Sequence, residues 1–283
     1  MLNSRGGGRE NAFNGRFLRN MCEIARVFLA IAMGLTVAAC TEGETGPVST
    51  ENITHEQVRE FLLGHPELIL DDPEIANAIE RARSNRTKKL AASYRRSVIE
   101  DQTDLLNSPL TPSSGETSAE VTIIEFYDYR CAPCIASHSG LEQVRSTDSN
   151  VRIVYAQLPT FGSHSIMAAR AAIAAQRQGH FEAFHAALMT TNTHPDIDSI
   201  YATAAEVGLN VEKLRADMRD PQVIQYLERV RLLAEALDVT GTPVFIVGSA
   251  ILRGGTTADE LHAEIARQRA QGEKMGEVSN VTS

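Results

Sequence analysis

Cysteine is scarce in this sequence, with four residues in 283, and its placement argues against a structural metal site. Two cysteines form Cys131-Ala-Pro-Cys134, whereas Cys22 and Cys40 lie in or beside an N-terminal apolar segment. A structural zinc ion usually needs a second Cys-x-x-Cys or a pair of histidines at fixed spacing. His138 follows Cys134 by four residues, but no fourth ligand is apparent. The pattern therefore predicts redox chemistry, with Cu(I) bound by the same two thiolates as the alternative.

Several other signals are missing as well. The sequence has no internal repeat, no P-loop and no dinucleotide-binding fingerprint, and we predict no cofactor. Its N-terminal apolar run, residues 27–39, has 13 residues and is too short for a comfortable transmembrane helix. Cleavage after residue 39 would remove five of the 27 basic and two of the 36 acidic residues, which leaves a formal net charge of −12. That acidic balance argues against nucleic acid as a partner.

The N-terminus has the parts of a secretory signal. Residues 1–26 contain five arginines and two glutamates, and the uncharged run that follows ends in small residues. A basic stretch, an apolar core and small residues at its end predict a signal peptide over residues 1–39. The mature chain is therefore expected outside the cytoplasm of a bacterium.

Val37-Ala-Ala-Cys40 also resembles a bacterial lipobox, in which the cysteine becomes the lipidated first residue. Ordinary cleavage after Ala39 is the alternative. Residues 40–53 have the composition of a solvated tether. We expect a protein of the periplasm or cell surface that is lipid-anchored to a membrane. Thr41 rather than Asp follows Cys40, and the resemblance to Gram-negative lipoproteins implies sorting to the outer membrane. With Cys40 lipidated, one dithiol remains in an oxidising compartment, which indicates a pair kept for exchange.

Residues 54–106 are predicted to be helical and amphipathic. Thr54 and Gln57 match a capping box, and Asp72-Pro73 is an N-cap followed by a first-turn proline at the start of a long helix. The apolar stripe of this helix is narrow, and such a stripe rarely supports a domain alone. It could pack on the main domain, or on its copy in a homo-oligomer formed through residues 54–106. The Pro/Ser-rich residues 107–118 are interpreted as a linker.

From residue 119 the pattern becomes that of an α/β domain, expected over residues 119–272 and followed by a tail over 273–283. Strand, helix and strand predict a right-handed, parallel βαβ unit. A helical insertion over about 163–238 separates this unit from a hairpin and a closing helix. The expected strands cover 121–126, 151–157, 243–247 and 250–253, and the helices beside them cover 131–145 and 258–269.

The Cys-x-x-Cys motif falls where the first strand turns into the helix of the βαβ unit. A cysteine at that point lies over unpaired backbone N–H groups and the positive end of the helix dipole, and this environment favours the thiolate. Cys134 lies one helical turn after Cys131 and can close a disulfide with it. The motif therefore predicts a thiol–disulfide oxidoreductase.

Four segments carry a resemblance to a known family: Ile124–Cys134, Ala168–Ala175, Gly208-Leu209 and Gly241–Gly248. They resemble the DsbA-like family of bacterial extracytoplasmic thiol–disulfide oxidoreductases, which implies a thioredoxin fold with an inserted helical domain. Residues 58–67 and the long helix after them resemble the subgroup that includes the suppressor-of-copper-sensitivity protein ScsC. In that subgroup the N-terminal region can mediate oligomerisation.

The resemblance implies roles for five residues. Cys131 would be the attacking cysteine and Cys134 the resolving one, while Glu125 would shuttle a proton to or from Cys134. Pro243 matches the cis-proline of the family, beside which the backbone of Thr242 pairs with a substrate strand. The implied partners are client proteins with thiols or disulfides and a membrane redox partner.

The dipeptide between the cysteines departs from the family. It is Ala-Pro rather than the Pro-His of strongly oxidising DsbA, so the Cys131 thiolate lacks a charge-assisted partner there. Arg130 either provides the missing positive charge for the Cys131 thiolate or is solvated. A thioredoxin-like proline before the second cysteine predicts a potential between roughly −270 mV for thioredoxin and −120 mV for DsbA. Oxidase and isomerase or reductase both remain open.

Overall fold

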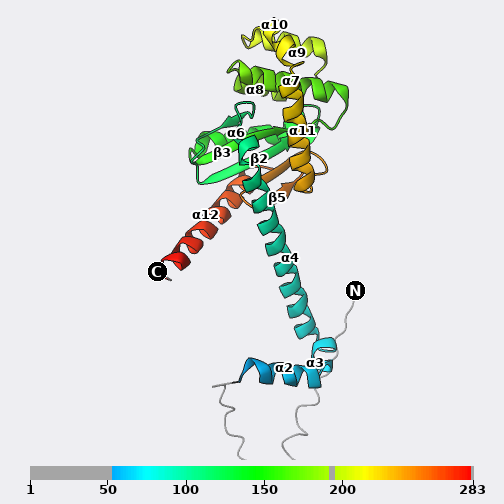
Figure 1. Cartoon of the computed structure of the whole chain (residues 1–283), viewed down its shortest axis with the longest axis vertical. Helices are drawn as coiled ribbons and strands as arrows, with labels where there is room; N and C mark the ends of the chain where they lie inside the picture. The colour runs from blue at the N-terminus through cyan, green and yellow to red at the C-terminus, as the bar shows by residue number, and fades with distance from the viewer. Residues whose placement is uncertain (1–52, 191–194, 282–283) are drawn as a thin grey trace, which may run out of the picture. The chain divides into compact units, whose positions relative to one another are not determined.

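The computed structural model describes residues 53–190 and 195–281 (Figure 1). The predicted signal peptide, Cys40 and nearly all of the predicted tether lie outside these residues. The chain divides into two compact units between Pro66 and Glu67. The described part of the first unit contains helix α2 (His55–Gly64), which begins with the predicted capping box. The Thr54 hydroxyl accepts the N–H of Gln57 at 3.3 Å, and the Gln57 side chain accepts the N–H of Thr54 at 2.9 Å.

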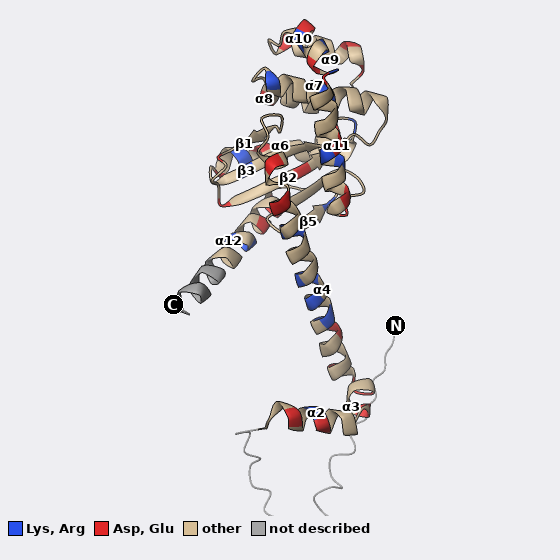
Figure 2. Ribbon diagram, in the orientation of Figure 1, with Lys and Arg blue, Asp and Glu red and all other residues tan. Residues whose placement is uncertain are grey.

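The second unit starts with the short helix α3 (Glu67–Leu70) and the long helix α4 (Pro73–Asp101). Asp72 caps α4 by accepting the N–H of Glu74 at 2.8 Å. The middle of α4 is basic, as Figure 2 shows, and none of its residues is fully buried. Only its C-terminal end packs against the domain core, through Val98 and Ile99. Helix α5 (Thr103–Leu106) follows and buries both of its leucines.

Five strands form one sheet in the order β1-β3-β2-β4-β5. Strands β2 (Val121–Tyr127) and β3 (Val151–Gln157) are parallel and are joined by helix α6 (Ala132–Thr147), as the βαβ pattern predicted. Strands β4 (Val244–Val247) and β5 (Ala250–Arg253) form the predicted hairpin. Strand β4 pairs antiparallel with β2, on the side of β2 opposite to β3. The predicted thioredoxin-like α/β fold is confirmed.

Two segments differ from the sequence-based expectation. The stretch 107–118 contains strand β1 (Ser113–Ser114), which pairs with β3. Pro112 and Gly115 flank this strand, so it is too short to show an alternating pattern. Helix α12 (Ala258–Val281) begins where expected but continues over most of the expected tail. Its apolar spacing ends near Ile265, but the residues that follow include no proline and, apart from Gly272 and Gly276, are mostly Ala, Arg, Gln, Glu and other residues that a helix tolerates.

The inserted helical region is confirmed as five helices within the described residues. They are α7 (Ser163–Arg177), α8 (Phe181–Thr190), α9 (Ile197–Glu206), α10 (Val211–Asp217) and α11 (Pro221–Ala236). Among the described helices, none combines the length and apolar character needed to cross a bilayer.

Two hydrophobic clusters cover the two faces of the sheet, because side chains alternate along β2. Ile123 and Tyr127 belong to the cluster that includes residues of α6, α8 and α12. Ile124 and Phe126 belong to the cluster that includes residues of α7 and α11. Glu125 therefore shares the face of Ile123 and Tyr127, beneath the helix that carries the two cysteines.

Candidate active site

Cys131 and Cys134 lie at the point where β2 passes into α6. Cys131 is the N-cap of α6, and Pro133 occupies the first turn, where its missing N–H costs nothing. The backbone N–H of Cys134 donates to Cys131 Sγ at 3.3 Å. Both residues are buried free thiols. The sulfur of Cys131 therefore takes the place of a capping oxygen at the positive end of the helix.

The two thiols have opposite pKa shifts. The pKa of Cys131 is lowered to about 6, mainly by its hydrogen bond with the Cys134 side chain and also by the Cys134 N–H. Burial and the charge of Asp128 oppose this shift. The pKa of Cys134 is raised well above its usual value, first by burial and then by its hydrogen bond to Cys131. At neutral pH the site therefore holds a thiolate at Cys131 and a thiol at Cys134, the combination that thiol–disulfide exchange requires.

The loop before β4, whose Thr242 is 111 residues from Cys131 in the sequence, lies against the dithiol. The peptide bond between Thr242 and Pro243 is cis, as the resemblance implied. Pro243 immediately precedes β4, whose Val244 pairs with Phe126 near the end of β2, so this loop reaches the turn before Cys131. In its protonated form, Cys131 Sγ donates to the carbonyl oxygen of Thr242 at 3.4 Å. The Thr242 hydroxyl is buried without a hydrogen-bond partner.

Glu125 is buried on the face of the sheet that lies beneath α6. Its side chain is 1% exposed, and neither carboxyl oxygen has a hydrogen-bond partner among the described residues. Burial, followed by the negative charges of Cys131 and Glu142, raises the pKa of Glu125 to about 8. A carboxyl group with a pKa near neutrality can both accept and return a proton.

Asp128 is a site residue that the sequence reasoning missed. Its buried carboxylate accepts the N–H groups of Arg130 at 2.8 Å, Thr160 at 2.6 Å and Phe161 at 3.3 Å. Nη1 of Arg130 donates to the carbonyl oxygen of Phe161 at 3.1 Å. The two side chains thus join the turn before Cys131 to the loop after β3. The bond from Asp128 to the N–H two residues later is an Asx turn, a local signal that could have been read from the sequence.

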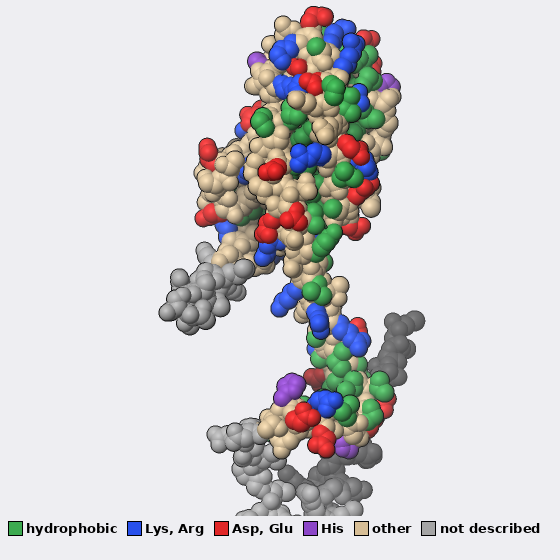
Figure 3. All heavy atoms as spheres, viewed as in Figure 1, with side chains coloured by type: hydrophobic (Ala, Val, Ile, Leu, Met, Phe, Trp, Pro, Cys, Tyr) green, Lys and Arg blue, Asp and Glu red, His purple; other side chains and the backbone are tan. Residues whose placement is uncertain are grey.

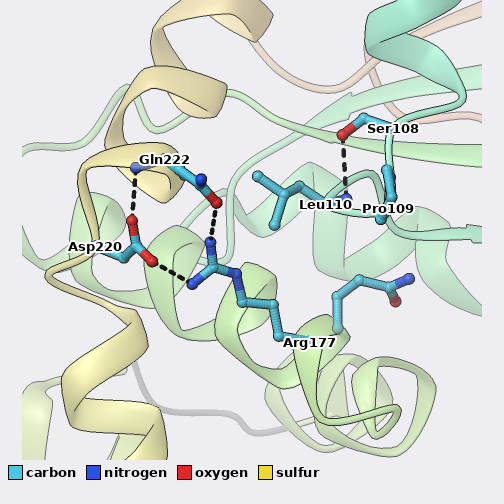
Figure 4. A pocket seen from close by; sticks show the side chains of 7 residues that line it. Ser108, Pro109, Leu110, Arg177, Asp220 and Gln222 are labelled. Atoms are coloured by element: carbon cyan, nitrogen blue, oxygen red, sulfur yellow. Dashed lines mark hydrogen bonds and ion pairs between the residues drawn. The ribbon is translucent and has the colours of Figure 1, made fainter.

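The described residues contain no group of three or more His, Cys, Asp or Glu side chains placed to hold a metal ion. A cavity of about 730 Å³ lies elsewhere in the second unit, between the ends of α7 and α11 (Figure 4). There Asp220 and Gln222 point toward Arg177, with Nη1 of Arg177 2.6 Å from Asp220 and 3.2 Å from Asp217. The arginine is therefore neutralised within the protein, and none of the residues that line the cavity belongs to the dithiol site.

Comparison with known proteins agrees with this geometry. The sequence matches the family model of the DSBA-like thioredoxin domain over residues 122–266. The chain belongs to this family. The matched residues of this DSBA-like protein include the helical insertion as well as the dithiol and the Thr242-Pro243 bond, so the fold is that of a thiol–disulfide oxidoreductase.

Solved structures of related proteins share this fold. A thioredoxin-like oxidoreductase from Silicibacter pomeroyi is 37% identical, with a TM-score of 0.57, and the match covers 59% of this chain and 98% of that one. The thiol–disulfide exchange protein α-DsbA2 from Wolbachia pipientis is 24% identical, with a TM-score of 0.57 over 62% and 96% of the two chains. A linker-deletion mutant of ScsC from Proteus mirabilis is 21% identical, with a TM-score of 0.57 over 79% and 100%. The last two likenesses show the fold alone.

The curated relatives that match this DSBA-like protein are named as Na(+)/H(+) antiporters. The Na(+)/H(+) antiporter NhaA of Herminiimonas arsenicoxydans is 31% identical over 186 residues, which are 64% of this chain and 30% of that protein. NhaA 3 of Salinispora tropica is 26% identical over 166 residues, with 56% and 26% coverage. The chain spans less than a third of the length of these relatives, so the likeness concerns that part of them only.

Proposed function

We propose that this protein is an extracytoplasmic thiol–disulfide oxidoreductase that acts on the cysteines of client proteins through Cys131 and Cys134. The observation that carries the proposal is the hydrogen-bonded pair of free thiols with opposite pKa shifts, at the start of α6 and against the carbonyl of Thr242. A thiolate of lowered pKa is reactive toward a disulfide and is also a good leaving group.

In the reducing direction, the Cys131 thiolate attacks one sulfur of a client disulfide. A mixed disulfide forms, and the other client sulfur leaves as a thiolate. Cys134 then gives its proton to Glu125 and attacks Cys131 Sγ, which closes the Cys131–Cys134 disulfide and releases the second client sulfur. The client gains two electrons and the enzyme loses two. The oxidising direction is the reverse, with Glu125 returning the proton to Cys134.

Thr242 and Pro243 are proposed to hold the client. The loop lies against the attacking sulfur, so an extended client segment that pairs with the backbone of Thr242 would bring its own sulfur to Cys131. The protein acts either as an oxidase or as an isomerase or reductase. The potential of the dithiol and a membrane redox partner decide between these two activities. Ala132 and Pro133 are exposed and provide no charged group beside Cys131, which supports a potential less oxidising than that of DsbA.

The proposed location is the periplasm, with the chain anchored through Cys40. A periplasmic thioredoxin-like protein from Salmonella enterica is 26% identical over 59% of this chain, which supports this location.

We further propose that α2 to α4 mediate homo-oligomerisation, because apolar side chains are exposed along them (Figure 3). These residues are Val58, Phe61, Leu63, Leu70, Leu90 and Tyr94. Light scattering tests this by comparing the mature chain with a chain that starts at residue 103. The proposal would be refuted if the mature chain, like the shorter one, had the mass of a monomer.

The activity is tested with reduced and oxidised protein in two assays, reduction of insulin and rearrangement of scrambled disulfides in a model client. Wild-type protein should be active in at least one assay, and Cys131→Ser should be inactive in both. Cu(I) binding by the same two thiolates is the alternative, since two adjacent free thiols suit a soft ion. Tight Cu(I) binding with no exchange activity in either assay would favour that alternative.

A further inference from the structure

The turn that carries Cys131 also contains a buried carboxylate, that of Asp128. The backbone carbonyl of Asp128 accepts the N–H of Cys131 at 3.1 Å, which closes a four-residue turn between the two. Oδ1 of Asp128 accepts the N–H of Arg130, the residue immediately before Cys131, at 2.8 Å. The side chain of Asp128 is buried, with 3% of the residue exposed. A buried carboxylate and the proposed attacking sulfur therefore belong to the two ends of one turn.

The second carboxylate oxygen of Asp128 fixes this arrangement. Oδ2 accepts the N–H of Thr160 at 2.6 Å and the N–H of Phe161 at 3.3 Å, and the Thr160 hydroxyl lies 3.4 Å from it. Because both oxygens accept and every one of these groups donates, the side chain is held as the acceptor-only carboxylate rather than as the acid. The donors are backbone N–H groups and one hydroxyl. They orient the negative charge without supplying a positive one.

The charge of Asp128 acts on Cys131 at neutral pH. Glu125 is another carboxyl group that interacts with Cys131, but with a pKa of about 8 it is largely protonated there. Nη1 of Arg130 donates to the carbonyl oxygen of Phe161 at 3.1 Å rather than to the Asp128 carboxylate. The charge of Asp128 raises the pKa of Cys131, against the hydrogen bonds at the start of α6 that lower it. The turn therefore opposes part of the thiolate stabilisation that the helix provides.

We propose that the carboxylate of Asp128 sets the potential of the dithiol and keeps it more reducing than the position of Cys131 at the helix start alone would make it. The inference rests on the proposed function and deepens it, because this potential decides between oxidase and isomerase or reductase. Reduction of the disulfide by two molecules of glutathione gives the Cys131 thiolate, the Cys134 thiol, oxidised glutathione and one proton. The glutathione thiols supply the two electrons. The thiolate of the reduced form is repelled by Asp128, whereas the neutral disulfide is not.

Asp128→Asn and Asp128→Ser remove the charge, and Asp128→Glu is the matched control. All three substitutions disturb the hydrogen bonds of the two carboxylate oxygens, but the control keeps the charge. In equilibrium with glutathione, the equilibrium constant for reduction should increase about tenfold in the two neutral variants, which is about 30 mV toward the potential of DsbA. The pKa of Cys131, measured by thiolate absorbance, should fall below its wild-type value. A purely structural role predicts the opposite sign, since a loosened turn would weaken the helix-start contacts that stabilise the thiolate.

The sign of the change in potential decides the outcome, and it is read from the neutral variants that keep the circular dichroism spectrum of the wild type. A potential that is unchanged or more negative in these variants would overturn the proposal, and so would an equal rise in Asp128→Glu. Failure of the proposed function is distinguishable, because the glutathione equilibrium needs no client protein. A wild-type protein without exchange activity toward clients would refute that function, whereas an active neutral variant with the wild-type potential would refute only the role of Asp128.

Discussion

Cys131 Sγ lies 3.4 Å from the carbonyl oxygen of Thr242, although 111 residues separate the two in the chain. This contact exists because β4 pairs with β2 and places its leading residues beside the turn that carries Cys131. The sulfur proposed to attack the client and the backbone proposed to hold the client therefore lie side by side. The chemistry of the site can be tested through this sulfur.

The first prediction concerns the ionisation of Cys131. With a pKa of about 6, Cys131 should be mostly thiolate at neutral pH and should lose reactivity as the pH falls through that value. Below it, the rate of alkylation should decrease about tenfold per pH unit, because the thiolate is the reacting species. Ultraviolet thiolate absorbance and iodoacetamide kinetics measure this, with Cys131→Ser as the control. A titration near the value of an ordinary thiol would contradict the site geometry.

The second prediction concerns the redox potential. The dithiol lacks the histidine found between the cysteines of DsbA, and Arg130 donates to Phe161. Equilibration with glutathione should give a potential between roughly −270 mV, the value for thioredoxin, and −120 mV, the value for DsbA. It should be clearly more negative than the potential of DsbA. Replacement of Pro133 by His should raise the potential, since an imidazolium would stabilise the thiolate. A wild-type potential equal to that of DsbA would show that another group stabilises Cys131.

The third prediction concerns Glu125 and has a definite sign. The folded-state pKa of about 8 lies above the unfolded value of 4.5, so this residue costs stability as the pH rises from 4.5 to 8. Glu125→Gln should therefore leave the free energy of unfolding of the reduced protein nearly unchanged below that window. Above the window it should raise this free energy by roughly a few kcal/mol. Denaturant titrations across the window measure this.

Glu116→Gln provides the matched control for Glu125, because Glu116 is exposed. The same substitution there should change stability little at any pH. Glu125→Gln should also slow the step in which Cys134 loses or regains its proton, while the alkylation of Cys131 remains fast. A variant that is no more stable than the wild type at high pH would indicate that Glu125 is not held in an unfavourable environment.

The fold and part of the site could be predicted from local patterns. The βαβ unit, the hairpin and the inserted helices follow from apolar spacing and caps, and the dithiol and Thr242-Pro243 are short motifs. Strand β1 could not be predicted, because two residues show no period. The bonds from Asp128 to Phe161 and from Tyr129 to His185 join residues 33 and 56 positions apart. They depend on how the loop after β3 and helix α8 pack over the sheet, which no local pattern records.

The central claim is that Cys131 exchanges disulfides with client proteins and that Cys134 resolves the intermediate. Cys134→Ala, expressed with its native N-terminus in a bacterial host and compared with Cys131→Ala/Cys134→Ala, tests it most directly. The single variant should accumulate protein adducts that a reductant releases and that require Cys131. A single variant with a free Cys131 thiol and no more adducts than the double variant would contradict the account.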